Sequence, residues 1–568
     1  MKTSRRSFLG AGVAAVAAGS ARVTAASGRA DFRDIVRLPD HVTAYAEGKP
    51  PQRLTRVAER WRADDIEITT ESKQRGKGAE LSITISSPRS ALTRVHLRWS
   101  GAMEDDLRFL GDHWERSYGD LEWRGYVGER IMPWYFLASR RDAIYGFGVK
   151  TGASAFCFWQ ADPRGYSLWL DVRNGGGGLE LGERRLSAAT VVALAGHPGA
   201  TPFQTAQELC HALCDHPRLP KAPVLGSNDW YYLYGENMTA EGILRDADLL
   251  AEISPVKPVA PFMVIDMGWS KAPEGAGPWK GDNLLFPDMP RLAAEIKKRG
   301  ARPGIWVRPL LSAETLPQAW RLPLNRPEGP YKAPLQVIDP SVPEALAHIQ
   351  EGLREVVGWG FELVKHDFST YDILGHWGHQ MGADLTSPGW HFADRSKTTA
   401  EVILQFYRAI REAVGDATLI GCNTVGHLGA GLFEVQRIGD DVSGRDWNRT
   451  RRMGVNALAF RLPQHGAFFC ADPDCVPITR DVPWKMTQQW LDLVVRTGTA
   501  LFISPDPSSV TAEEKKALKA ALAAASRAPA NPQPLDWTET TAPKRWLLGG
   551  DVTNFEWFGE EGAYPLSR

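Results

Sequence analysis

The stretch FELVKHDF, residues 361–368, begins as a buried strand and ends in charged groups. In an extended chain Leu363 and Val364 face a core, whereas Lys365 and Asp367 stand two residues apart and so lie on one face. Two opposite charges at the end of an apolar strand are costly to bury unless they pair or act on a ligand. Three interpretations follow: a satisfied ion pair, a metal site with nearby histidines, or a catalytic carboxylate.

The same pattern, a short apolar strand followed by a helical stretch, repeats from about residue 222 to about residue 525. Residues 240–253 and 343–360 show the helical spacing of apolar residues. Eight such units in succession are typical of a (β/α)8 barrel, which we expect over residues 222–525. The expected strands are 224–232, 261–269, 301–309, 361–368, 417–423, 432–441, 466–472 and 499–505.

The segments on either side of the barrel differ in pattern. Over residues 31–215 apolar and polar residues alternate, as in 79–87 and 93–101, which predicts an all-β sandwich domain. A helix near 201–216 is expected to lead out of it. Residues 530–568 are expected to form a small C-terminal β segment.

Polar and aromatic residues gather where the expected barrel strands end. In a (β/α)8 barrel the carboxyl ends of all strands meet at one face, and this face holds the active site. These residues are Asn228, Asp229 and Trp230; Asp266 and Trp269; Trp306 and Arg308; Lys365 and Asp367; Cys422 and Asn423; Arg437, Asp440 and Asp441; and Asp472 and Asp474. Several acids with basic and tryptophan neighbours suit a hydrolase.

Two of these carboxylates suit glycoside hydrolysis, which needs a nucleophile or base together with an acid. Asp367 suits the nucleophile, because Lys365 on the same face favours its ionised form. Asp441 suits the acid/base, since it lies on a polar loop beyond the sixth strand. The alternatives are a buried Lys365–Asp367 ion pair and a solvated turn at 439–441.

Five motifs in this order resemble the α-galactosidase clan of glycoside hydrolases. They are SNDWYYLYGENMTAEGILRDADLL at 227–250, VIDMGW at 264–269, FPDMPRLAAEIKKRGARPGIWV at 286–307, LVKHDF at 363–368 and RIGDDVSG at 437–444. The resemblance covers the barrel and is closest to the melibiase-like family 36, with families 27 and 31 more distant. It implies a β-supersandwich before the barrel and a small β domain after it.

The resemblance also implies roles for individual residues. Asp367 would be the nucleophile of a retaining double displacement, and Asp441, four residues after Arg437, the acid/base. Alignment on the glycine of the more distant relatives selects Asp440 instead. The expected sugar contacts are Lys365 and Arg437 to hydroxyls, Asp266 on the far side of the ring, Trp230 and Trp306 as walls, and Cys422 and Asn423 at the 2-hydroxyl.

One position departs from the family pattern. α-Galactosidases commonly carry two consecutive aspartates after the second strand, and here the second is Met267. A buried carboxylate that binds hydroxyls is thereby replaced by an apolar side chain, at a loss of about 1 kcal/mol per hydrogen bond. An α-galactoside or a related sugar is the expected substrate.

Two other classes of function stay open. A metal-dependent hydrolase on the same barrel would use His376, His379, His391, Asp372 and Asp384, but glycines interrupt any helix there and no third ligand is fixed by spacing. A non-catalytic carbohydrate-binding barrel is the other alternative. We expect no metal and no cofactor.

Residues 1–30 read as a twin-arginine export signal, with Arg5 and Arg6 before a short Ala/Gly-rich apolar run. This predicts contact with the twin-arginine export machinery, which moves folded proteins, and a periplasmic or secreted location. A disulfide between Cys470 and Cys475 stays open. With 66 basic and 67 acidic residues, the chain lacks the excess of positive charge that is typical of nucleic-acid-binding proteins. No membrane span is expected after signal removal. Carbohydrate is the expected partner, and the sequence leaves open a homo-oligomer.

Overall fold

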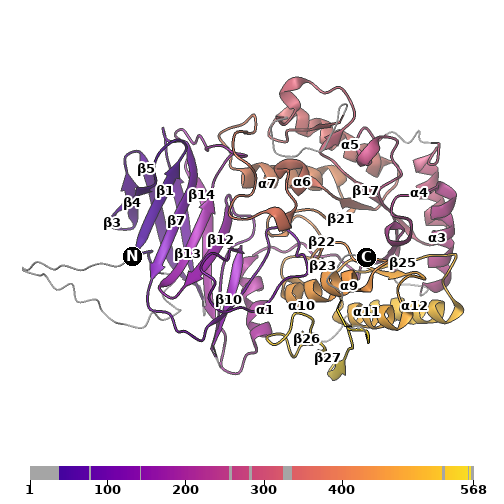
Figure 1. Ribbon diagram of the computed structural model, residues 1–568. Helices are drawn as coiled ribbons and strands as arrows, with labels where there is room; N and C mark the ends of the chain where they lie inside the picture. The colour runs from indigo at the N-terminus through magenta and orange to yellow at the C-terminus, as the bar shows by residue number, and fades with distance from the viewer. Residues whose placement is uncertain are drawn as a thin grey trace, which may run out of the picture.

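The structure is a computed structural model that describes residues 37–563, apart from 76–77, 141–142, 255–258, 280–283, 324–334, 528–530 and 561. The predicted signal at 1–30 lies outside the described residues. Figure 1 shows the N-terminal β strands on one side of the molecule and the helices and strands of the second half on the other. No helix among the described residues has the length and apolar character needed to cross a membrane.

The N-terminal part is a sandwich of two antiparallel sheets, as the sequence predicts. The six-stranded sheet has the order β2-β1-β7-β13-β12-β9, and the eight-stranded sheet the order β3-β4-β5-β6-β14-β11-β10-β8. The first consists of β1 (His41–Ala46), β2 (Gln52–Arg53), β7 (Leu92–Ser100), β9 (Met132–Pro133), β12 (Phe156–Asp162) and β13 (Gly165–Asp171). The second consists of β3 (Thr55–Val57), β4 (Arg60–Ala63), β5 (Ile66–Arg75), β6 (Gly78–Ser86), β8 (Arg108–Gly111), β10 (Tyr135–Arg140), β11 (Ala143–Val149) and β14 (Leu186–Ala195).

Alternation of residue type decides which face of each strand enters the sandwich core. In β6 the side chains of Leu81, Ile83 and Ile85 are buried, and the residues between them are partly exposed. From Leu81 to Ile85 every second residue is apolar and buried. Because a shift by one residue would expose all of them, this alternation fixes the register of a sheet that buries one face. The predicted exit helix is α1 (Pro202–Leu213), which begins with a capping box at Thr201.

The second half contains one parallel sheet that curls into a barrel, as predicted. Its order is β23-β22-β21-β20-β17-β16-β15-β25-β24. The strands are β15 (Leu225–Asn228), β16 (Phe262–Ile265), β17 (Arg302–Val307), β20 (Leu363–His366), β21 (Thr418–Gly421), β22 (Val435–Arg437), β23 (Cys470–Asp472), β24 (Cys475–Ile478) and β25 (Leu501–Pro505). β23 lies within the seventh expected strand, 466–472, and β24 lies beyond it. The two share the seventh place in the barrel, because β23 pairs with β22 and β24 with β25.

Amphipathic helices cover the outside of this sheet. They are α3 (Ala240–Ile253), α4 (Met289–Lys298), α5 (Pro343–Gly358), α7 (Thr399–Val414), α11 (Trp484–Thr497) and α12 (Ala512–Ala525). Shorter elements lie in the segments between the strands. These are α2 (Trp230–Leu233), η2 (Pro273–Gly275), β18 (Leu311–Ser312), η3 (Gln318–Trp320), β19 (Gln336–Val337), α6 (Ser369–Leu374), η4 (Gly378–Gln380), α8 (Gly426–Gly429), α9 (Trp447–Thr450), the π-helix η5 (Arg451–Asn456), α10 (Ala457–Arg461) and η6 (Leu462–Gln464).

All eight expected strands are longer than the real ones, and the first and the sixth show why. The first was expected over 224–232 but ends at Asn228, and Trp230 begins the helical turn α2. Asn228 ends the pairing because its side-chain oxygen accepts a hydrogen bond from the Trp230 amide at 2.9 Å. The sixth was expected over 432–441 but ends at Arg437, so 438–441 is a loop.

The C-terminal strands β26 (Gln533–Pro534), β27 (Arg545–Leu548) and β28 (Asp551–Asn554) form a small antiparallel sheet. Trp546 and Trp557 are buried beneath it. The indole of Trp447, in α9 of the barrel, donates a hydrogen bond to the carbonyl of Trp557 at 2.8 Å.

The β-sandwich and the barrel are joined by buried polar contacts. Arg461 of α10 forms an ion pair with Asp112 at 2.7 Å, and both side chains are buried. Gln464 donates hydrogen bonds to Asp112 at 2.9 Å and to the hydroxyl of Tyr135 at 2.8 Å. Removing one member of such a buried network leaves the others unsatisfied, which fixes how the two parts meet.

Candidate active site

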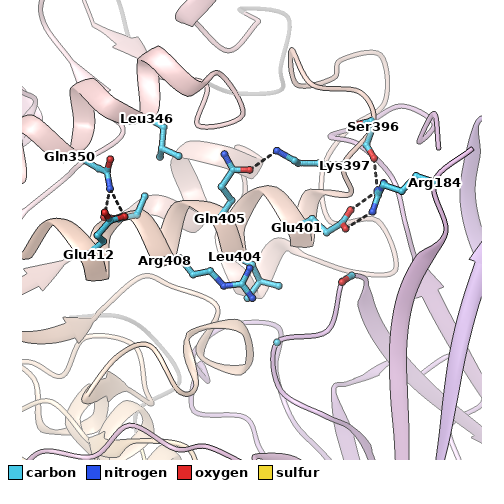
Figure 2. Close-up of a pocket in the computed structure, with 13 residues that line it drawn as sticks. Arg184, Leu346, Gln350, Ser396, Lys397, Glu401, Leu404, Gln405, Arg408 and Glu412 are labelled. Atoms are coloured by element: carbon cyan, nitrogen blue, oxygen red, sulfur yellow. Dashed lines mark hydrogen bonds and ion pairs between the residues drawn. The ribbon is translucent and has the colours of Figure 1, made fainter. Parts of the chain in front are cut away.

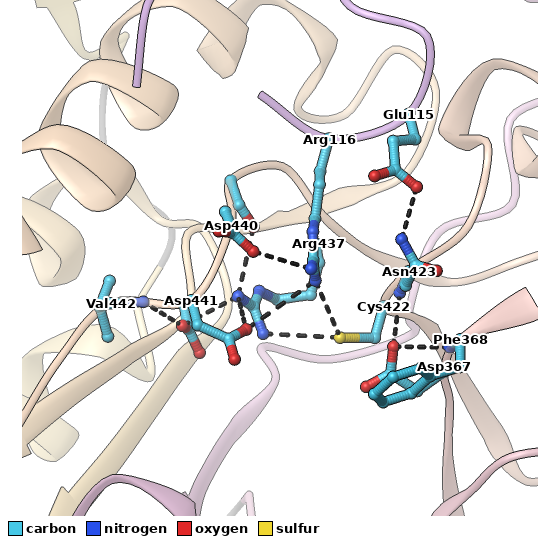
Figure 3. Close-up of polar contacts among 12 residues, drawn as sticks. Glu115, Arg116, Asp367, Phe368, Cys422, Asn423, Arg437, Asp440, Asp441 and Val442 are labelled. Carbon is cyan, nitrogen blue, oxygen red and sulfur yellow. Dashed lines mark hydrogen bonds and ion pairs between the residues drawn. The ribbon is translucent and has the colours of Figure 1, made fainter. Parts of the chain in front are cut away.

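Asp367 lies just beyond β20 and is held by three donors. Its Oδ1 accepts hydrogen bonds from the amides of Phe368 at 2.8 Å and Asn423 at 2.9 Å, and its Oδ2 accepts one from the Trp306 indole at 2.9 Å. Figure 3 shows the carboxylate beneath Cys422 and Asn423. Donors on both oxygens fix the rotamer and favour the ionised form.

The ion pair of Lys365 is made with Asp266. The Lys365 ammonium lies 2.7 Å from Asp266 Oδ2, which also accepts a hydrogen bond from the side-chain amide of Asn228 at 2.7 Å. The three residues come from β20, from the loop after β16 and from the end of β15. The alternative of a Lys365–Asp367 ion pair is therefore wrong, and Lys365 instead pairs with a residue that follows β16, beyond the intervening strand β17.

Asp440 and Asp441 follow β22 and have different partners. Asp441 Oδ1 lies 3.1 Å from Nη2 of Arg437, and its side chain is 39% exposed. Asp440 is 16% exposed and is held between Arg116 at 2.7 Å and Arg449 at 2.8 Å. Of the two, Asp441 is the carboxylate with more access to solvent and more distant cationic partners.

Two residues of the site come from the β-sandwich, as Figure 3 shows. The chain after β8 pairs with the loop after β22, since the Ser117 amide donates to the Ile438 carbonyl and the Asp440 amide to the Ser117 carbonyl. This places Arg116 beside Asp440 and 3.8 Å from Asp441. Glu115 is buried, and its Oε2 accepts a hydrogen bond from the Asn423 side chain at 2.5 Å.

Cys422 and Asn423 end the fifth strand and are both buried. Nη1 of Arg437 lies 3.6 Å from the Cys422 sulfur, and Nη1 of Arg116 lies 3.7 Å from it. The Asn423 side chain donates to Glu115 and accepts from the Tyr371 amide at 3.1 Å. Asn423 thus holds neighbouring parts of the site in place.

The two tryptophans expected as walls differ in exposure. Trp306 is buried, and the tight turn at Gly275 packs on its ring, where a β-carbon would come within 2.3 Å. Its indole nitrogen supports Asp367. Trp230, in α2, is half-buried, and its ring packs at a steep angle on Tyr234.

The charges around Asp367 decide its protonation. Burial opposes its ionisation, but Lys365, Arg116 and the Trp306 hydrogen bond outweigh burial and hold its pKa at about 2. Asp367 is therefore ionised at neutral pH. Burial likewise opposes ionisation of Asp441, yet Arg437, Arg116 and Lys365 hold its pKa below the ordinary value, while the Asp367 charge raises it.

Three side chains of the alternative metal site, those of Asp372, Asp384 and His379, contact other groups. Asp372 forms a buried ion pair with Arg308 at 2.8 Å, and Asp384 pairs with Arg94 and Arg173. The ring of His379 packs on Tyr118. Within the described residues, no group of three His, Cys, Asp or Glu side chains is arranged to hold a metal ion.

All six cysteines have free thiols and are buried. The bridge left open between Cys470 and Cys475 is absent: these residues begin β23 and β24.

A pocket of about 530 Å³ lies away from these residues, between α7, α5 and the β-sandwich (Figure 2). Polar side chains that line it hydrogen-bond to one another: Arg184 to Glu401, Lys397 to Gln405, and Gln350 to Glu412. None of the predicted site residues lines it.

Sequence reasoning missed Arg116, Glu115 and Tyr231. The first two lie in HWERSYGD at 113–120, about 250 residues before Asp367, where no strand-end pattern marks them. The sequence predicted that Tyr231 lies in the first barrel strand. In the structure Tyr231 belongs to α2, and its hydroxyl donates a hydrogen bond to Asp474. The signal in the sequence was that Glu115 and Arg116, two adjacent charged residues, stand between aromatic residues in a domain whose strands otherwise alternate apolar and polar residues.

Comparison with known proteins finds similar structures. No protein-family model matches the chain, and no curated protein matches it in sequence. Among solved structures, TtGalA, an α-galactosidase from Thermus thermophilus, superposes with a TM-score of 0.60 at 20% identity, over 86% of this chain and 96% of that one. The GH36 α-galactosidase AgaA from Geobacillus stearothermophilus gives 0.58 at 14% identity, over 85% and 75%.

The galactosidase domain of AgaSK, an α-galactosidase–sucrose kinase, matches with a TM-score of 0.54 at 14% identity, over 82% of this chain and 67% of that one. At such identities the likeness establishes the fold. Over most of its length, this chain has the fold of the family 36 α-galactosidases.

Proposed function

We propose that this protein is an exported retaining exo-α-glycosidase that hydrolyses a terminal α-galactoside or a related sugar through a covalent glycosyl-enzyme. The observation that carries the proposal is Asp367: an ionised carboxylate, held by three donors, at the carboxyl end of the fourth strand of an α-galactosidase-like barrel. The α-galactosidase structures named above support the sugar class.

In this mechanism Asp367 attacks the anomeric carbon while Asp441 protonates the leaving oxygen. A water molecule, activated by Asp441, then hydrolyses the glycosyl ester. The electrostatics favour this exchange of roles, because the Asp367 charge raises the pKa of Asp441. Esterification removes that charge, so Asp441 becomes more readily ionised when it must act as a base.

Binding of the sugar rests on groups around these two acids. Lys365, Asp266 and Arg437 offer polar atoms that hydrogen-bond hydroxyls, and Trp230 offers an apolar face. Met267 in place of a second carboxylate favours a sugar that lacks a hydroxyl there or presents it differently. Related α-glycosides therefore belong in the substrate search.

Export rests on the twin-arginine segment at residues 1–30. Six free, buried thiols support a protein whose folding needs no oxidising compartment. Cell fractionation tests this part: changing both Arg5 and Arg6 to lysine should leave the protein in the cytoplasm. Export of that variant at the normal level would contradict it.

The activity is tested with nitrophenyl α- and β-glycosides of galactose, glucose, N-acetylgalactosamine and L-arabinose. We expect an α-glycoside to be cleaved, and proton NMR to show the α-anomer as first product. Asp367→Asn should lower kcat by at least about 1,000-fold, equal to about 4 kcal/mol. Asp384→Asn, the same chemical change at an exposed aspartate, is the matched control and should stay active.

A fluorinated glycosyl inactivator gives a second measurement of the same step. The wild-type protein should gain the mass of one sugar, on the peptide that contains Asp367. Turnover close to wild-type by folded Asp367→Asn, or a β-anomer as first product, would refute the mechanism.

A further inference from the structure

Asp474 lies in the break between β23 and β24, at the mouth of the barrel. Its backbone has a φ of +78°, in the left-handed region that a non-glycine residue seldom adopts. Its amide donates to Asp472 Oδ1 at 2.9 Å, and its side chain is buried. The two halves of the seventh strand thus meet in a turn that presents a buried carboxylate.

One oxygen of this carboxylate has three donors. Asp474 Oδ2 accepts hydrogen bonds from the Val442 amide at 2.9 Å, from Nη2 of Arg437 at 2.9 Å and from the hydroxyl of Tyr231. Val442 directly follows Asp441, and Figure 3 shows both beside the Arg437 guanidinium. Asp474 therefore anchors the backbone that carries the acid/base.

The same nitrogen of Arg437 also contacts Asp441. Nη2 lies 2.9 Å from Asp474 Oδ2 and 3.1 Å from Asp441 Oδ1. Arg437 is buried, so its charge needs a carboxylate close by. If Asp441 were the sole counter-charge of Arg437, protonation of Asp441 would leave the buried guanidinium of Arg437 without a negative partner.

The surroundings of Asp441 agree with this sharing. Burial and the charge of Asp441 raise the pKa of Asp474. By reciprocity the charge of Asp474 raises the pKa of Asp441 and opposes the pull of Arg437. The titratable and charged groups that face Asp441 are Arg437, Asp440, Arg449, Arg116, Lys365, Asp367, Tyr231 and Asp474.

We propose that Asp474 is a positioning residue for the acid/base: it anchors Val442 and shares Arg437 with Asp441, so that Arg437 opposes protonation of Asp441 less than it would without Asp474. This role rests on the proposed glycosidase function. The break in the seventh strand then serves catalysis, because it places the Asp474 carboxylate next to Arg437 and Val442.

Asp474→Asn tests the charge while keeping the shape. We expect the basic limb of the kcat/KM profile, which reports protonated Asp441, to move to lower pH by about one unit. Cleavage of alkyl glycosides, which need protonation, should slow more than cleavage of nitrophenyl glycosides. An unmoved basic limb would overturn the proposal.

Two further variants separate charge from packing. Tyr231→Phe removes one hydrogen bond to Asp474 and leaves every charge in place, so the basic limb should not move. Asp474→Glu keeps the charge and should restore the limb of the wild-type protein, even if kcat falls. A limb that moves equally in all three variants would show a structural role alone and would overturn the proposal.

A measurement without substrate separates this inference from the proposed function. Urea unfolding of Asp441→Asn, Asp474→Asn and the double variant gives a coupling between the two carboxylates. Since they share one guanidinium, Asp441→Asn should lower the unfolding midpoint more in the Asp474→Asn background than in the wild-type protein. The unfolding result does not depend on activity. If no glycoside is cleaved but the coupling is found, the proposed function is refuted and the shared-arginine inference stands.

In the cycle with Asp474→Asn, a coupling of zero or of opposite sign would overturn the shared-arginine inference. A second cycle uses Asp474→Glu, which keeps the counter-charge, so there the coupling should be close to zero. A cost of Asp441→Asn in the Asp474→Glu background as large as in the Asp474→Asn background would also overturn the inference.

Discussion

Arg116 allows a sharp prediction, because two arginines bind the same carboxylate in different surroundings. Arg116 reaches Asp440 at 2.7 Å with a side chain that is 6% exposed, whereas Arg449 reaches it at 2.8 Å with one that is 42% exposed. Removing one partner of a buried ion pair costs about 3–5 kcal/mol, and an exposed pair contributes about 0–1 kcal/mol.

We therefore expect Arg116→Met to lower the free energy of unfolding by about 2–3 kcal/mol. This loss is smaller than the one for a fully buried pair, because Asp440 keeps Arg449 and is itself partly exposed. Arg449→Met, the matched control, should cost about 1 kcal/mol or less. Methionine preserves most of the aliphatic packing in both variants. Urea unfolding at neutral pH and moderate salt measures both differences.

The two variants should also differ in the pH dependence of activity. The charge of Arg116 lowers the pKa of both Asp367 and Asp441. Its removal raises both pKa values, so both limbs of the kcat/KM profile should move to higher pH. Equal losses of stability in the two variants, or an Arg116→Met profile that stays in place, would refute the inference that the β-sandwich tunes the site.

The remaining predictions concern the acid/base, the sugar and the region of the alternative metal site. Asp441→Ala should slow alkyl glycosides far more than activated aryl glycosides, and azide should restore turnover; if Asp440→Ala behaves this way instead, the acid/base is Asp440. Met267→Asp should raise kcat/KM for an α-galactoside relative to the native substrate, and a flat ratio would place Met267 outside the sugar site. Arg308→Met should cost about 3–5 kcal/mol in urea unfolding, because it leaves the buried Asp372 without its guanidinium, and adding Asp372→Asn should recover part of the loss. EDTA should leave activity unchanged, whereas its loss on chelation would revive the metal-dependent alternative.

The sequence by itself determined the architecture and the order of the barrel strands. A strand that buries Leu363 and Val364 and then ends in polar residues can place Asp367 only at the carboxyl face of a parallel barrel. Local periodicity carries this information, because it repeats within each short unit of the chain. The position of the nucleophile candidate therefore followed from the pattern around it.

Tertiary structure alone decided which charges meet. Lys365 pairs with Asp266 across two strands of the barrel instead of with Asp367 two residues away, because side-chain direction and reach are set by the curled sheet. Arg116 enters from another domain, and nothing near it in sequence marks that contact. The same holds for Asp474, whose partners come from α2, from the end of β22 and from the loop after β22. Long-range electrostatic pairing depends on distances through space, and those exist only once the chain has folded.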